Sequence, residues 1–104
     1  MGPAEIEEAL IRHPAVSEAA VVGVPDEITG EAIVAFVVLK QPAEPRELAE
    51  HVAARMGAAF RPKRVIPVDE FPKTQSGKIV RRKLRERAVE LPRDQDHDTA
   101  GGGD

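Results

Sequence analysis

The sequence contains no cysteine, tryptophan or tyrosine, and only three phenylalanines among its 104 residues. Without cysteine, neither a disulfide framework nor a thiolate metal site can form, and this composition fits a cytoplasmic protein. Because large aromatic side chains are scarce, the core must be aliphatic, built from Val, Ile, Leu and Ala. No apolar run approaches the ~20 residues of a membrane helix, and no signal peptide is visible. We therefore expect one small cytoplasmic domain without a membrane segment or a metal site.

The net charge of −3 conceals three blocks of different sign. Residues 1–59 carry 4 basic and 10 acidic residues, a net charge of −6. Residues 60–87 carry 10 basic and 3 acidic residues, a net charge of +7, and residues 88–104 carry 1 basic and 5 acidic residues, a net charge of −4. The positive block favours a nearby anion, for which phosphate, carboxylate and nucleic acid are all candidates.

The spacing of apolar residues predicts a small α+β domain, with a three-stranded sheet and helices packed on its faces. The expected elements are a helix ended by Pro14, a strand at 16–24, a strand at 32–39, a helix at 46–56, a strand at 65–68 and a last helix with Ile79, Val80, Leu84 and Ala88 on its apolar face. The first two strands are close enough in sequence to form an antiparallel pair. We expect this domain to occupy residues 1–91, and the acidic, glycine-rich residues 92–104 to be a disordered tail.

Three finer expectations concern the placement of single side chains. Alternation along the first strand places Val16 on the same side as Ala20, Val22 and Val24. The two histidines before the positive block have no partner ligand nearby in sequence, so His13 is expected to be structural or solvated, and His51 to lie on the surface.

A polar loop precedes the last helix, and its sequence over residues 72–78 is PKTQSGK. Pro72 forces the backbone out of regular structure, and Gly77 permits conformations that a side chain forbids. Taken alone, Lys78 after Gly77 is typical of a solvated surface lysine. A phosphate-binding P-loop is excluded, because the upstream glycine is missing and Ile79 replaces the magnesium-binding hydroxyl.

Three stretches together resemble the carboxy-terminal domain of AMP-forming acyl-CoA synthetases, in the adenylate-forming superfamily. They are residues 2–10 (GPAEIEEAL), residues 13–26 with HPAV and AAVVGVPD, and residues 72–85 with PKTQSGK followed by Arg81, Arg82, Leu84 and Arg85. The likeness covers about residues 2–88 in the same order throughout. The family's hinge and its upstream β-hairpin would lie before Gly2 and are absent from this sequence.

The resemblance implies a mobile lid of a larger enzyme. Lys78 would be the lysine that enters the cleft during adenylation, supported by Pro72, Thr74, Ser76 and Gly77. A missing amino-terminal domain would hold the small carboxylic acid substrate and ATP with its Mg²⁺, and CoA would be the second co-substrate. This chain alone would then bind none of them and catalyse nothing. In the second half-reaction, the resemblance implies that the lid rotates and that CoA takes the acyl group.

The resemblance also implies regulation, because in bacterial members the same lysine is acetylated by GNAT-type protein acetyltransferases in a P-x-x-x-x-G-K context. Pro72 to Lys78 has that pattern. Acetylation would remove the charge used in adenylation. We expect such an acetyltransferase to dock on a basic surface of Arg81, Arg82, Lys83 and Arg85. The alternatives are a module serving purely as a docking and acetylation substrate and, with few aromatics near the positive block, a nucleic-acid-binding domain.

Overall fold

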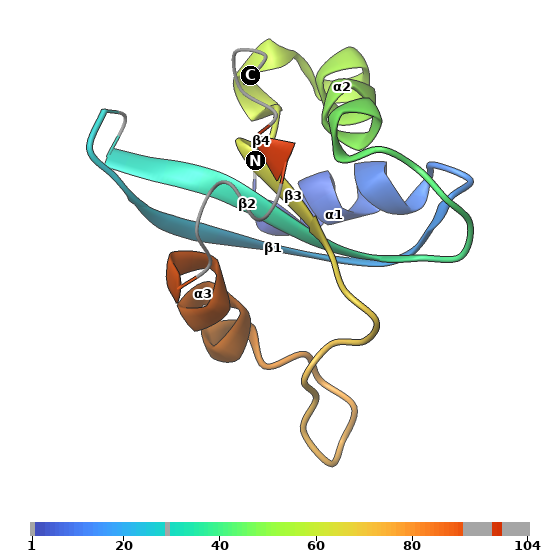
Figure 1. The fold of residues 1–104 in the computed structure, drawn as a ribbon, viewed down its shortest axis with the longest axis vertical. Helices are drawn as coiled ribbons and strands as arrows, with labels where there is room; N and C mark the ends of the chain where they lie inside the picture. The colour runs from blue at the N-terminus through green and yellow to red at the C-terminus, as the bar shows by residue number, and fades with distance from the viewer. Residues whose placement is uncertain (1, 29, 91–96, 99–104) are drawn as a thin grey trace.

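The computed structural model describes residues 2–28, 30–90 and 97–98. The elements are α1 (Pro3–Ile11), β1 (Val16–Asp26), β2 (Gly30–Leu39), α2 (Pro45–Met56), the short 3₁₀ helix η1 (Ala58–Phe60), β3 (Arg64–Pro67), α3 (Arg81–Glu90) and the two-residue strand β4 (His97–Asp98). The predicted α+β fold is confirmed, because three α-helices pack on a mixed sheet (Figure 1).

The strands lie in the order β1-β2-β3-β4. β1 and β2 are antiparallel, as predicted, with Val21 opposite Ala35, and β2 pairs with β3 in parallel. These are the three expected strands, and β4 adds a short antiparallel partner for Arg64 and Val65. Most of the residues predicted to form a disordered tail, 92–96 and 99–104, lie outside the described residues.

The sheet separates two apolar cores and is covered on both faces. Figure 1 shows α1 and α2 on one face and α3 on the other. The first core contains Leu10 of α1 and Leu48 of α2, and the second contains Phe36 of β2 and Leu84 of α3. The expected aliphatic core is therefore found, with one large aromatic side chain, Phe36, fully buried in it.

The position predicted for Val16 is wrong. Val16 belongs to the core under α1 and α2, whereas Ala20, Val22 and Val24 face α3. A register irregularity between Val16 and Glu18 inserts one extra residue into the alternation. A β-bulge moves every earlier side chain to the other face of the strand.

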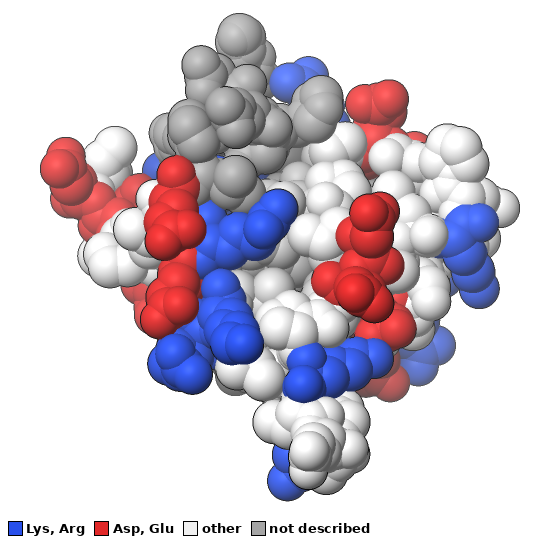
Figure 2. Space-filling model, turned by 60° about the horizontal axis from the view of Figure 1, so that its bottom comes forward, with Lys and Arg blue, Asp and Glu red and all other residues white. Residues whose placement is uncertain are grey.

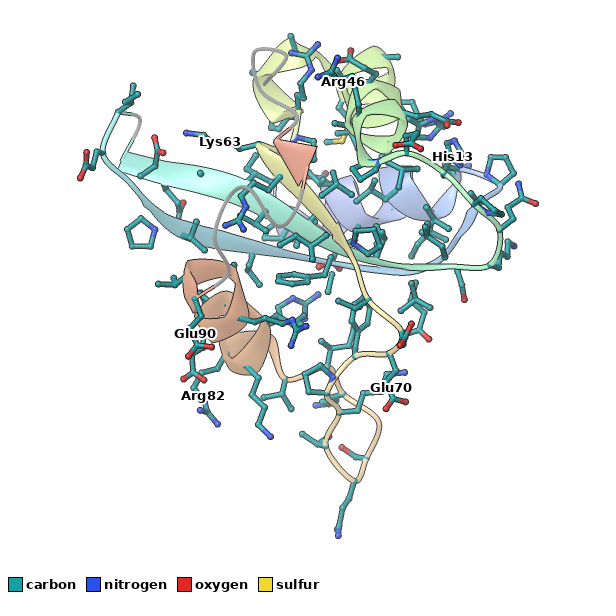
Figure 3. All side chains as sticks on the ribbon, in the orientation of Figure 1. His13, Arg46, Lys63, Glu70, Arg82 and Glu90 are labelled. Carbon is teal, nitrogen blue, oxygen red and sulfur yellow. The ribbon has the colours of Figure 1, made fainter. Side chains whose placement is uncertain are left out.

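The expectation that His51 lies on the surface is also wrong. His51 is half-buried, its Nε2 lies 3.0 Å from the Ala9 carbonyl, and its ring meets that of His13 edge-on with centroids 5.1 Å apart. His13 lies just after the end of α1 (Figure 3). It accepts the Ala15 N–H at Nδ1, and its Nε2 lies 2.9 Å from the Glu47 carboxylate of α2. His13 is thus structural, one of the two roles expected for it, and both rings join α1 to α2.

No helix in the described part of the chain is both long and apolar enough to cross a membrane.

Candidate functional site

Residues 72–80 form a short β-hairpin that projects from the domain beside α3 (Figure 1). Two backbone hydrogen bonds join its arms, one from the Thr74 N–H to the Lys78 carbonyl (2.8 Å) and one from the Val80 N–H to the Pro72 carbonyl (2.9 Å). Together they form the antiparallel bridge between Lys73 and Ile79. The segment predicted as a loop closed by a helix is therefore an ordered hairpin that leads directly into α3.

A tight turn at the tip of the hairpin sets the direction of Lys78. The Gly77 N–H donates to the Thr74 carbonyl at 2.9 Å, and Gly77 has φ of +90°, a conformation that favours glycine. The Thr74 hydroxyl accepts the Lys78 N–H at 3.1 Å and lies 3.0 Å from the Ser76 hydroxyl. The hairpin thus brings Thr74, Ser76, Gly77 and Lys78 together at one turn.

Lys78 is exposed at the tip. Within the part of the chain that the structure describes, no hydrogen bond or ion pair engages its ammonium group. The cation is therefore available to a group outside this domain.

Apolar contacts anchor the base of the hairpin to the sheet. Phe71 is 5% exposed and belongs to the core on the α3 side, and Ile79 packs against the same core from the other arm. Pro72 is half-buried between them and the exposed tip. The hairpin therefore projects from a fixed base.

Two ion pairs tie the hairpin arms to the rest of the fold. Lys73, in the first arm, lies 3.2 Å from Glu18 of β1. Arg81, directly after the second arm, pairs with Glu7 of α1. Glu7 also accepts the backbone N–H of Val21 at 2.8 Å.

Helix α3 is held against the sheet by apolar and polar contacts. Leu84 and Ala88 are buried against it. The Arg85 Nε donates to the Gly23 carbonyl at 3.3 Å, and the buried Arg64 of β3 donates to the Ala88 carbonyl at 2.8 Å. The last contact places a guanidinium at the helix C-terminus, where a positive charge is favoured.

The four residues predicted to dock an acetyltransferase do not share one role. Arg81 and Arg85 contact α1 and β1, as described above. Arg82 projects from α3 away from the sheet, 3.5 Å from Glu86 (Figure 3). Lys83 lines a groove of about 680 Å³ together with acidic residues that include Glu70.

The positive block is therefore divided into smaller patches. Among its ten basic residues, these pair with carboxylates: Arg61, Lys63, Lys73, Arg81 and Arg82. Figure 2 shows separate basic patches on the side of α3 and the hairpin, with acidic side chains between them. Such a surface differs from the continuous basic stripe typical of nucleic-acid binding.

Among residues 2–28, 30–90 and 97–98, no group of three or more His, Asp or Glu side chains is placed to hold a metal ion.

Comparison with known proteins identifies the family. Residues 5–78 match the family described as the AMP-binding enzyme C-terminal domain. The match covers more than half of the chain and ends at Lys78. The chain belongs to this family.

Individual relatives agree with that assignment. An acetyl-coenzyme A synthetase from Streptomyces coelicolor is 56% identical over 87 residues, which are 79% of this chain and 13% of that enzyme. The crystal structure of a Brucella canis acyl-CoA synthetase matches with a TM-score of 0.79 at 47% identity, over 86% of this chain and 18% of that one. ATP-bound MatB from Rhodopseudomonas palustris matches with a TM-score of 0.80 at 31% identity, over 85% of this chain and 18% of that one.

The chain thus spans less than a fifth of each of these proteins. The predicted resemblance to acyl-CoA synthetases is confirmed at the level of this C-terminal domain. Sequence reasoning found the exposed lysine segment, as a loop and not as a hairpin, and missed the contacts of Glu7 and Glu18 that hold it. The sequence signals such contacts only by a surplus of acidic residues before a basic block, and this surplus does not specify which acidic residue pairs with which basic one.

Proposed function

We propose that this chain is the mobile lid of an AMP-forming acyl-CoA synthetase and that Lys78 serves the adenylation half-reaction. The observation that carries the proposal is the exposed ammonium of Lys78, which has no ion-pair partner among the described residues. The backbone that carries it is nevertheless held by five hydrogen bonds within residues 72–80. A rigid base with a free cation suits a group that must act on a ligand in another domain.

The chemistry requires a positive charge at this point. When a carboxylate attacks the α-phosphate of ATP, two anions approach each other and negative charge builds on the phosphoryl oxygens. A positioned ammonium reduces the repulsion and stabilises that charge. Lysine suits the role because its ammonium is a compact charge with rotatable donors. Lys78 acts here as an electrostatic stabiliser and not as a base.

The remaining components belong to the amino-terminal domain of the complete enzyme. That domain holds ATP with Mg²⁺ and the carboxylic acid, and CoA displaces AMP after the lid has rotated. Binding of ATP by the related MatB supports the choice of nucleotide. The 56% identity to an acetyl-coenzyme A synthetase makes acetate the first carboxylic acid to test.

The test compares the complete enzyme with this chain alone. With acetate, ATP, Mg²⁺ and CoA, the complete enzyme is expected to form acetyl-CoA, AMP and pyrophosphate, whereas the isolated domain forms none. A complete enzyme that turns over none of a series of short, medium and aryl acids would contradict the proposal. Steady turnover by the isolated domain would contradict its assignment as a lid.

A second function is supported at the same residue, namely control by acetylation. Lys78 is exposed at a projecting tip, as a modifying enzyme requires, and acetylation would remove the charge that adenylation uses. A GNAT-type protein acetyltransferase is the proposed partner in a bacterial cytoplasm. Of the expected docking residues, Arg81 and Arg85 bond to α1 and β1, whereas Arg82 pairs within α3 and Lys83 lines the groove.

Acetylation is tested by incubating the chain with acetyl-CoA and a bacterial GNAT-type protein acetyltransferase, followed by peptide mass spectrometry. Modification is expected at Lys78 and is expected to be lost in Lys78→Arg. Charge reversal at Arg82 and Lys83 should slow it, and Arg46→Glu, on α2, is the control. Modification spread evenly over the surface lysines would contradict a specific site, and equal rates in all variants would contradict the docking surface.

A further inference from the structure

One carboxylate oxygen of Glu7 contacts two other elements of the fold. Its Oε2 accepts the Val21 N–H at 2.8 Å and pairs with the Arg81 guanidinium. Glu7 lies in α1, on one face of the sheet, and Arg81 begins α3 on the other (Figure 1). Val21 lies in β1, the strand at the end of the sheet order. The Glu7 side chain therefore crosses the outer edge of β1 and joins the two helical layers.

The environment of Glu7 makes this pair stronger than an ordinary surface ion pair. The Glu7 side chain is 13% exposed, whereas that of Arg81 is 42% exposed, and the other partner of Glu7 is a backbone amide. Because the Glu7 carboxylate is shielded and already held by that amide, its charge-assisted hydrogen bond to Arg81 requires little further ordering of the Glu7 side chain. The Glu18–Lys73 pair is longer, at 3.2 Å, and both of its side chains are about two-fifths exposed. Ion pairs this exposed contribute little to the stability of the fold.

Arg81 lies where the hairpin returns to the domain. The preceding residue, Val80, makes the bond to Pro72 that closes the arms, and Lys78 lies three residues before Arg81. A shift of Arg81 therefore moves the arm that carries Lys78. The pair with Glu7 holds the residue that directly follows this arm, whereas the Glu18–Lys73 pair holds the opposite arm.

We propose that Glu7 is a positioning residue for Lys78. By fixing Arg81 against the edge of β1, Glu7 sets the angle at which the second arm leaves the domain, and so the place that the ammonium reaches in the cleft. This role rests on the function proposed above for Lys78. Because misplacement of a catalytic group by about 1 Å can cost a hundredfold in rate, partial loosening is expected to cost about tenfold.

The test uses the complete enzyme with Glu7→Gln. Glutamine keeps the shape of the side chain and an oxygen for the Val21 N–H but loses the charge facing Arg81. Glu8→Gln is the matched control, because Glu8 is the next residue of α1, is exposed and lies 3.5 Å from Arg12 in an i,i+4 pair. We expect acetate-dependent pyrophosphate exchange to fall about tenfold in Glu7→Gln, mainly in kcat, and to stay unchanged in Glu8→Gln.

Two further measurements separate positioning from a merely structural role. Thioester formation from pre-made acyl-adenylate should be unchanged in Glu7→Gln, because the lysine hairpin has rotated away in that step. In a Lys78→Ala background, Glu7→Gln should cause no additional loss, because it acts through the missing ammonium. Arg81→Gln should reproduce the loss while leaving the Glu7–Val21 contact in place.

The possible failures are distinguishable. If Lys78→Ala abolishes exchange but Glu7→Gln behaves like Glu8→Gln, Glu7 is not a positioning residue and the role of Lys78 stands. If Glu7→Gln lowers the melting temperature and slows both half-reactions, with or without Lys78, its role is structural and the inference is wrong. If Lys78→Ala leaves exchange intact, the function proposed for Lys78 fails, and the inference fails with it.

Discussion

The hydroxyl of Thr74 accepts the backbone N–H of Lys78 at 3.1 Å, across the turn that the two residues enclose. The Thr74 N–H also donates to the Lys78 carbonyl at 2.8 Å, so Thr74 holds both polar groups of the Lys78 backbone. The side chain that serves the proposed chemistry is thus free, while its backbone is fixed by a neighbour four residues earlier.

The first prediction concerns Thr74. Thr74→Val keeps the shape of the side chain but removes the oxygen that accepts the Lys78 N–H. We expect pyrophosphate exchange by the complete enzyme to fall about tenfold, because the ammonium then samples unproductive positions. Thr74→Ser, which retains the oxygen, should keep most of the activity. Equal activity of the Val and Ser variants would show that this bond does not orient Lys78.

The second prediction concerns the backbone at Gly77. A Cβ there meets no atom within 4 Å, so any effect of Gly77→Ala arises from the φ of +90° and not from a clash. A left-handed conformation costs a residue with a side chain about 1–2 kcal/mol. We expect faster amide hydrogen exchange at Thr74 and Val80 in Gly77→Ala. Gly2→Ala, at a φ of −116° with equally open space, is the control that should leave both amides protected.

The third prediction concerns the buried guanidinium of Arg64, which is 7% exposed and donates to the Ala88 carbonyl at 2.8 Å. Arg64→Met keeps the apolar stem but leaves this helix-terminal carbonyl without its charged donor. The free energy of unfolding should fall by about 1–3 kcal/mol in urea denaturation. Arg61→Met removes a more exposed pair with Glu50 and should cost less than Arg64→Met does. The reverse order would contradict the structural role of Arg64.

The fourth prediction concerns pH. Burial of His51 between α1 and α2 lowers its pKa below the usual 6.5, an effect that the bond to Ala9 only partly offsets. As the pH falls through 6.5, the unfolded chain therefore takes up a proton before the folded one does. His51 therefore contributes stability to the folded state above pH 6.5, and this contribution is lost as the pH falls through the lower pKa of the folded state.

Urea denaturation of the chain at about pH 8 and about pH 5 measures this difference. His51→Gln retains a donor for the Ala9 carbonyl but cannot titrate. It should therefore lose less stability on acidification than the parent chain. An equal loss in both chains would show that His51 does not contribute to the pH dependence.

Local patterns predicted much of the fold. The four-residue spacing of Leu48, Val52 and Met56 predicted the second helix, and the apolar run from Ala32 to Leu39 predicted the central strand. The turn at the lysine was also accessible, because Gly77 before Lys78 predicts a backbone that only glycine adopts readily. These features depend on neighbours in sequence, which is why a single sequence contains them.

Contacts between distant segments could not be predicted in the same way. Glu7 and Arg81 are 74 residues apart, and the pattern of either segment does not specify the other as its partner. The bulge that turns Val16 toward the other face changes register without a glycine or proline to mark it. The burial of His51 depends on the packing of α2 against α1, which periodicity along α2 alone does not define.

The most direct test of the account replaces Lys78 with alanine in the complete enzyme and measures the two half-reactions separately. We predict that pyrophosphate exchange falls by about 10²–10³-fold, while pre-made acyl-adenylate and CoA still give thioester at the parent rate. Exchange that survives the substitution would contradict the assignment of Lys78 to adenylation. An equal loss in both half-reactions would contradict a charge that acts in only one of them.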